Sequence, residues 1–331
     1  MTGTLLVWLL LGVLVIASAW NWIRVARRIA QGEPVLRAEP RPTEGVAVQA
    51  ALLALVTALL IPSLCALGWL HYRGVTPAEY ARQAATLTET RSAESRLFDE
   101  LRFVDAIARL LSVIAVGTAL HRWLGQGSWL SKLTCKTLIA DLWIGLAAFV
   151  LIVPPVLLVK VGVSKLINAS DLDEAHPLIH RIRTEPGQWT VFAMVGLSAV
   201  VAAPLYEELL FRQMIQGFLQ RLDAWRITHF ARLPHRSARR RADHDDSVND
   251  SPGNVPTGYW PMLVSAGLFA GVHLGHGVDP LPLFLLGAGL GYLYRQKNRL
   301  LPCVVVHALL NGLTLLQLAA EAFQRSSAPA S

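Results

Sequence analysis

The chain has 331 residues and a formal net charge of +7; 53% of its residues are hydrophobic and 16% are charged. Soluble domains average roughly 45–50% apolar and about 25% charged residues, and this chain has several apolar runs of about twenty residues, the length of a membrane-spanning helix. The composition therefore excludes an ordinary soluble protein and predicts an integral, multi-pass membrane protein. Its basic residues lie in loops beside the apolar runs, where membrane orientation explains them, so we expect no nucleic-acid partner.

The apolar runs predict an all-α, polytopic transmembrane helix bundle of about eight spans with a polar interior cavity. We divide the chain into N-terminal membrane helices (1–135), a membrane core (136–320) and a tail (321–331). The three cysteines have no C-x-x-C spacing and are expected to be buried small hydrophobic residues. At about twenty residues per span, the helices lie near residues 4–20, 46–70, 103–121, 136–160, 188–212, 259–276, 280–295 and 300–320.

The distribution of arginine and lysine among the loops of the whole chain places both termini outside. Asp105 and Arg109 interrupt the helix expected near 103–121, and an interfacial amphipathic helix is the alternative for this stretch. With that alternative the N-terminus lies inside, while the second half keeps its orientation. Residues 71–102, rich in Ala, Glu and Arg, are expected to form a surface helix outside the membrane.

The helix near 188–212 carries a cluster of ionisable residues, which are costly at membrane depth and usually mark a working site. Glu208 and Arg212 lie one helical turn apart, in the favourable order for an ion pair. Taken alone, this pair is more often a structural clamp than an active group. Glu207 is rotated by about 100° around the helix axis from Glu208, so its carboxylate is not committed to Arg212 in the same way. To reach the level of the later helices, this helix must continue past Arg212 to about residue 222.

A polar stretch at 228–257, rich in Arg, Asp, Ser, Pro and Gly, is expected to be a mobile loop, because it cannot bury enough apolar area to fold. The last helices carry two pairs of residues four positions apart, Phe269 with His273 and His307 with Asn311, so each pair can face one direction. Three helices could thus present a carboxylate, two imidazoles and an amide to one point. That set suits a metal-bound water or a water activated directly by a glutamate. A single intramembrane histidine is more often a packing residue or relay.

These residues resemble a family of intramembrane proteases, the CAAX prenyl protease 2 and bacteriocin-processing family, also called Abi or CPBP. The family pattern is E-E-x-x-x-R, then F-x-x-x-H, then H-x-x-x-N or D on successive membrane helices. The chain has these elements in that order at Glu207–Arg212, Phe269–His273 and His307–Asn311. The resemblance covers roughly residues 190–320 and implies a helical bundle with a conical interior cavity.

The resemblance also implies an activity, that of an intramembrane endopeptidase and therefore a hydrolase. Glu207 would act as the general base on water, and Glu208 and Arg212 would support it. The implied partners are membrane lipid and a peptide or protein substrate, with lipidated substrates among the candidates.

For the remaining motif residues, the resemblance implies contact with a metal or with the water. His273 and His307 would bind a metal or polarise the water, and Asn311 would complete the coordination or stabilise the oxyanion. In the metalloprotease version, a divalent cation, zinc as the first choice, is held by His273, His307 and Glu207.

Two non-enzymatic interpretations stay open. A membrane protein of the same fold could act through binding, as in bacteriocin immunity, and would keep every motif residue. A proton-coupled transporter could use the carboxylates and histidines as a relay. Transporters often show internal symmetry between halves, which this sequence lacks, and its intramembrane motif residues are confined to three C-terminal helices. That distribution favours a single hydrolytic site.

Overall fold

The computed structural model describes residues 2–39, 48–86, 93–124, 133–166, 189–230, 258–274 and 279–327. Every regular element in these ranges is a helix, as the composition predicts, and none of the ranges contains a strand. The first half contains α1 (Thr2–Ala30), α2 (Val48–Tyr72), α3 (Pro77–Thr86), α4 (Ala93–Leu124) and α5 (Cys135–Leu166).

One long, continuous helical segment opens the second half. It contains α7 (Trp189–Gly196), η5 (Leu197–Ala202), α8 (Ala203–Glu208), η6 (Leu209–Gln216) and α9 (Gly217–Phe230). It is followed by α10 (Trp260–Gly271), α11 (Pro280–Lys297) and α12 (Leu301–Ser327). All eight predicted helices are therefore present.

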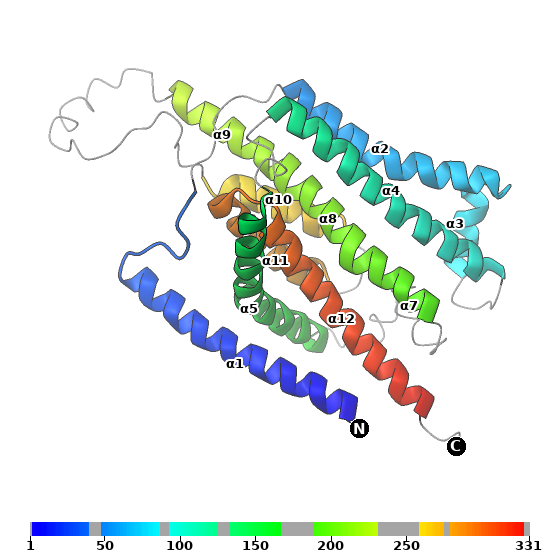
Figure 1. Ribbon diagram of the computed structural model, residues 1–331, viewed down its shortest axis with the longest axis horizontal. Helices are drawn as coiled ribbons and strands as arrows, with labels where there is room; N and C mark the ends of the chain where they lie inside the picture. The colour runs from blue at the N-terminus through cyan, green and yellow to red at the C-terminus, as the bar shows by residue number, and fades with distance from the viewer. Residues whose placement is uncertain are drawn as a thin grey trace.

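The helices pack as a bundle in which the long segment α7–α9 and α12 lie in the middle (Figure 1). On one side α12 packs against α5, which in turn contacts α1; on the other side the long segment packs against α4, which contacts α2. The helices predicted to carry the site thus meet at the centre of the bundle. Helix α1 begins and α12 ends at the same end of the bundle (Figure 1).

In the described ranges, five helices are long and apolar enough to cross a membrane. Many of their large apolar side chains are exposed to the surroundings of the protein, as expected of helices that face lipid. The protein is therefore an integral, multi-pass membrane protein. The stretch with Asp105 and Arg109 is one of the five, whereas the number of eight spans stays a prediction. The five are Leu52–Tyr72, Asp99–Arg122, Cys135–Leu166, Phe192–Ile227 and Leu301–Ala320.

Residues 71–102 do not form one surface helix, because they end α2, contain α3 and begin α4. Gly74, at a φ of +67°, takes a left-handed conformation that suits glycine and turns the chain after α2. A capping box then starts α3: Glu79 accepts hydrogen bonds from the backbone N–H (2.8 Å) and the hydroxyl (2.7 Å) of Thr76. These two bonds lower the pKa of the Glu79 carboxyl. Residues 87–92 lie outside the described ranges.

The long helical segment continues past Arg212 to Phe230, which confirms that this helix extends beyond its predicted span. The loop expected at 228–257 therefore starts later, because residues 228–230 are still helical; 231–257 lie outside the described residues. At the other end of the core, α12 continues to Ser327, through the stretch expected to be a tail.

Close helix contact fixes the position of α12. A Cβ atom added at Gly145 of α5 would lie 2.6 Å from Cβ of Val305 on α12, a distance at which something must shift. Small residues at such interfaces let two membrane helices approach closely. Since His307 lies two residues after Val305, the same contact sets the level of the histidine.

Candidate active site

The long segment that carries Glu207 and Glu208 alternates between two helix types. The π-helical stretches η5 and η6 flank the short helix α8, which begins near Pro204 and ends at Glu208. In a π-helix each N–H bonds to the carbonyl five residues back, and such stretches are frequent at functional sites. The N–H of Ala203, for example, bonds to the carbonyl of Ser198.

Asn311 of α12 ties this helix to η5. Its Nδ2 atom donates a hydrogen bond of 2.7 Å to the carbonyl oxygen of Ala199. In the π-helical pattern the donor for that carbonyl would be the N–H of residue 204, which Pro204 lacks. The side chain of Asn311 thus supplies the hydrogen bond that the proline cannot.

Glu208 joins two helices through its two carboxylate oxygens. Its Oε2 accepts a hydrogen bond of 2.8 Å from Nε of Arg212, the predicted ion pair, and both side chains are fully buried. Its Oε1 lies 2.9 Å from Nδ1 of His307 on α12. Because the carboxylate accepts the Nδ1 hydrogen, a neutral His307 ring keeps a lone pair on Nε2.

Arg212 extends this network to α10. Its Nη1 donates to Oγ of Ser265 at 3.3 Å, and that hydroxyl donates to the carbonyl of Phe211 at 2.8 Å. The guanidinium carbon also lies 5.5 Å from the ring centre of Phe269. Arg212 is therefore bound on several sides by protein groups, as a structural cation at membrane depth must be.

Glu207 points away from Arg212, as its rotation on the helix predicts. Its Oε2 lies 3.9 Å from Nε2 of His307, which is too long for a hydrogen bond. Its Oε1 lies 3.4 Å from Nη1 of Arg109 on α4. The side chain is 17% exposed, whereas that of Glu208 is fully buried, so Glu207 is the accessible carboxylate of the two.

Arg109 is a site residue that the motif search missed. Its Nε donates to Oδ2 of Asp105 at 2.8 Å, and its guanidinium carbon lies 5.3 Å from the ring centre of Tyr206. Like Glu207, Asp105 and Arg109 are ionisable residues inside an apolar run, which usually marks a working site. Their spacing of four is also that of an ion pair on a helix.

His273 lies just after α10, in a turn, because the helix ends at Gly271 and not near residue 276 as predicted. The backbone N–H of His273 bonds to the carbonyl of Ala270 at 3.1 Å, a tightened last turn. Its ring Nδ1 lies 2.7 Å from the carbonyl of Phe269, which can only accept, so Nδ1 donates the bond. This side-chain bond satisfies a carbonyl at the helix end. His276 lies outside the described residues.

The ring of Phe269 contacts both imidazoles. It is fully buried, with ring centres 5.1 Å from His273 and 5.7 Å, edge to face, from His307. Tyr206, the residue before the two glutamates, donates its hydroxyl to the carbonyl of Ala58 at 3.0 Å. Its hydroxyl is thus engaged within the bundle.

The predicted metal can be tested against this geometry. No group of three or more His, Cys, Asp or Glu side chains in the described ranges is arranged to hold a metal ion. Nε2 of His307 lies 3.9 Å from Oε2 of Glu207. The ring of Phe269 packs against the imidazoles of both His273 and His307. This arrangement does not fit a three-ligand metal site, so no step below goes through a metal. The metal at His273, His307 and Glu207 stays a prediction.

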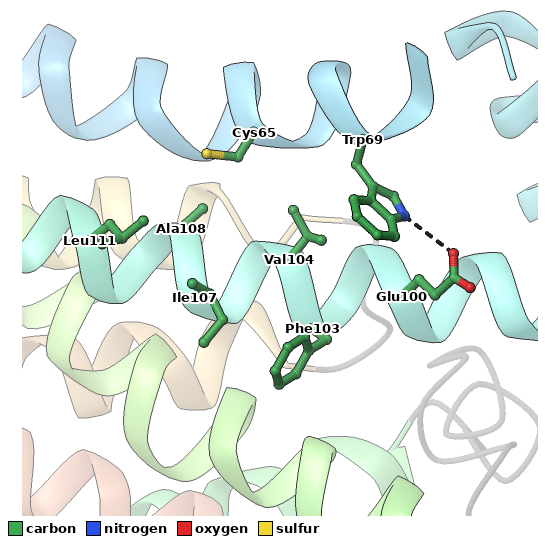
Figure 2. A pocket seen from close by; sticks show the side chains of 8 residues that line it. All are labelled: Cys65, Trp69, Glu100, Phe103, Val104, Ile107, Ala108 and Leu111. Atoms are coloured by element: carbon green, nitrogen blue, oxygen red, sulfur yellow. Dashed lines mark hydrogen bonds between the residues drawn. The ribbon is translucent and has the colours of Figure 1, made fainter. Parts of the chain in front are cut away.

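A pocket of about 440 Å³ lies between α2 and α4, apart from these residues (Figure 2). It is apolar except at one end, where Nε1 of Trp69 donates to Oε2 of Glu100 at 3.3 Å, next to Arg73. None of the seven motif residues lines it. The lining residues are Cys65, Trp69, Glu100, Phe103, Val104, Ile107, Ala108 and Leu111.

Fold and site together define a class, that of helical multi-pass membrane proteins with a cluster of acidic, basic and imidazole groups buried where several helices meet. Residues 188–313 match the family described as Rce1-like, Type II CAAX prenyl endopeptidase Rce1-like. This match confirms the resemblance for the second half of the chain, and all three motif elements lie in the matched part. Comparisons with curated proteins and with solved structures gave no match.

Proposed function

We propose that the protein is an intramembrane endopeptidase that hydrolyses a peptide bond with a water molecule activated by Glu207. One observation carries this proposal. The accessible carboxylate of Glu207 faces Nε2 of His307 at 3.9 Å, while the buried Glu208 holds the opposite nitrogen of the same ring. A base and an oriented imidazole thus meet inside the part of the chain that matches a protease family.

In the proposed reaction, Glu207 takes a proton from water as the water oxygen attacks the carbonyl carbon of the substrate. The new C–O bond turns the carbonyl oxygen into an oxyanion. With Nδ1 already donating, each imidazole can donate to this oxygen from Nε2 only when it is doubly protonated. In that form His307, and His273 if its ring reaches the same oxygen, would stabilise the negative charge in a water-poor site. Glu207 then returns the proton to the amine as the C–N bond breaks.

The other motif residues would position this pair. Glu208 fixes which nitrogen of His307 faces the substrate, and Arg212 neutralises the buried charge of Glu208. The bond from Asn311 to the carbonyl of Ala199 supports a positioning role for Asn311. The metal-dependent version of the proposal, with zinc held by His273, His307 and Glu207, requires these three side chains to leave the arrangement described above.

The proposed substrate is a membrane-associated peptide or protein. The description of the matched family names CAAX prenyl endopeptidases, so the first probe is a peptide that ends in a prenylated cysteine and three further residues. A prenyl chain would bring such a peptide to the membrane, where the site lies.

The test is a cleavage assay on detergent-purified protein with a fluorogenic peptide that ends in a farnesylated cysteine and three residues. Glu207→Gln should lower kcat by at least about 100-fold, the lower bound for loss of a general base. Glu33→Gln, at an exposed glutamate that lies 4.0 Å from Arg28, is the matched control and should behave as wild type. A Glu207→Gln protein that cleaves at the wild-type rate would contradict the proposal. Metal analysis of wild type and His307→Ala, together with activity after chelation, distinguishes the metal-dependent mechanism from direct base catalysis. Metal lost in His307→Ala would support coordination, and activity without metal would support direct base catalysis.

A further inference from the structure

We propose that Arg109 is a positioning residue for Glu207, so that the N-terminal helix α4 completes the active site. This inference rests on the proposed function of Glu207. Arg109 lies outside residues 188–313, the part that matches the protease family, and its contact with Glu207 joins residues 98 positions apart. The matched part therefore does not contain every group that touches the proposed base.

The two oxygens of Glu207 have different neighbours. Oε1 faces Nη1 of Arg109 at 3.4 Å, and Oε2 faces Nε2 of His307 at 3.9 Å. Arg109 thus holds one side of the carboxylate and leaves the other directed at the imidazole. The two side chains are only 28% and 17% exposed, so water screens this interaction less than it screens a surface pair.

Arg109 is itself held in place from other directions. Asp105, one turn earlier on α4, accepts from Nε at 2.8 Å, which leaves Nη1 for Glu207. The ring of Tyr206 lies 5.3 Å from the guanidinium carbon. A planar guanidinium can serve two carboxylates and an aromatic face at once, which a lysine ammonium does less well.

Packing gives the contact its rigidity. Helix α4 packs directly against η5 and α8, the helix that ends with Glu208. An aspartate and an arginine inside an apolar run cost free energy of insertion. Pairing Asp105 with Arg109 offsets that cost only in part, and the second contact of Arg109 is with the proposed catalytic base.

The test compares Arg109→Gln, Arg109→Lys and Asp105→Asn with wild type in the farnesyl-peptide assay. The matched control is Arg122→Gln, an exposed arginine in the last turn of the same helix. We expect Arg109→Gln to lower kcat by about 10- to 100-fold, the cost of a misplaced catalytic group. KM should change by less than about threefold, because substrate binding is not the step affected. Arg109→Lys should recover part of the loss, and Asp105→Asn should add little in the Arg109→Gln background.

Two results would overturn the proposal: an unchanged kcat in Arg109→Gln, or equal losses in Arg109→Gln and Arg109→Lys together with the same fall in Tm. The second result would assign Arg109 to stability alone. Failure of the proposed function gives a different pattern, since Glu207→Gln would then keep its activity. If Glu207→Gln is inactive while Arg109→Gln is fully active, only the role of Arg109 is lost.

Discussion

Arg212 is a buried charge that is paired with a carboxylate and contacted by further protein groups. Its side chain is fully buried beside the equally buried Glu208, and it also contacts Ser265 and Phe269. An ion pair in a low-dielectric environment is weak evidence of stability as a whole. Removal of one partner is nevertheless costly, because the other charge is left uncompensated.

We therefore expect Arg212→Ala to destabilise the protein by about 3–5 kcal/mol. The measurement is the Tm of detergent-purified protein, with Arg122→Ala as the exposed control on another helix. The double variant Glu208→Gln with Arg212→Met should lose less stability than Arg212→Ala, because it leaves no buried charge. Equal Tm values for Arg212→Ala and Arg122→Ala would show that the buried pair is not coupled.

The residues of the site could be predicted from sequence wherever a local spacing carried the information. The spacing of Glu208 and Arg212 predicts their ion pair, and the rotation of Glu207 predicts that it points elsewhere. The contact between Arg109 and Glu207 could not be predicted in this way, because it depends on which helices pack together. The spacing of residues along a helix shows which side of the helix each side chain is on, but not which residue of another helix it contacts.

At the scale of the element, η5 and its proline explain why α12 is bound to the long helix. Pro204 offers no N–H to the carbonyl of Ala199, and Asn311 donates to it in place of the backbone. A buried carbonyl left without a donor costs about 1–3 kcal/mol. The π-helical stretch itself was not predictable, because apolar periodicity indicates a helix without fixing its hydrogen-bond register.

Asn311→Ala should therefore lower stability by about 1–3 kcal/mol. In Pro204→Ala with Asn311→Ala, the new N–H at residue 204 can bond to Ala199, so the double variant should recover part of the lost Tm. Thermal unfolding of the two single variants and the double variant measures this coupling. Strictly additive losses would contradict the proposed exchange of donors.

The element boundaries show the same limit of sequence analysis. The apolar runs predicted all eight helices, but α10 ends five residues earlier than expected, since 276 minus 271 is 5. The side chain of His273 bonds to the carbonyl of Phe269 at that end. Such an end is fixed by hydrogen bonds, which hydropathy does not report.

At the scale of the whole molecule, the bundle places the start of α1 and the end of α12 at one end (Figure 1). An even number of crossings has this result, and the positive-inside rule predicts that both termini lie outside. Helix α3 would then lie outside, and Cys135 at the start of α5, which is exposed and not buried as expected, would face the cytoplasm.

Labelling of intact cells with a membrane-impermeant maleimide tests this orientation. Cys135 should stay unlabelled from outside and become labelled in inverted vesicles. A cysteine introduced by Arg82→Cys on α3, in a Cys135→Ser background, should show the reverse pattern. Outside labelling of Cys135 would show that the predicted orientation is wrong.

The reach of Arg109 across the bundle has a practical consequence for protein engineering. A chimera that grafted only residues 188–313 onto foreign helices would retain every signature residue and still lack the cation beside Glu207. Inactivity of such a hybrid would say nothing about the grafted signature, because the recipient helices would also have to supply a pair equivalent to Asp105 and Arg109 at the right depth.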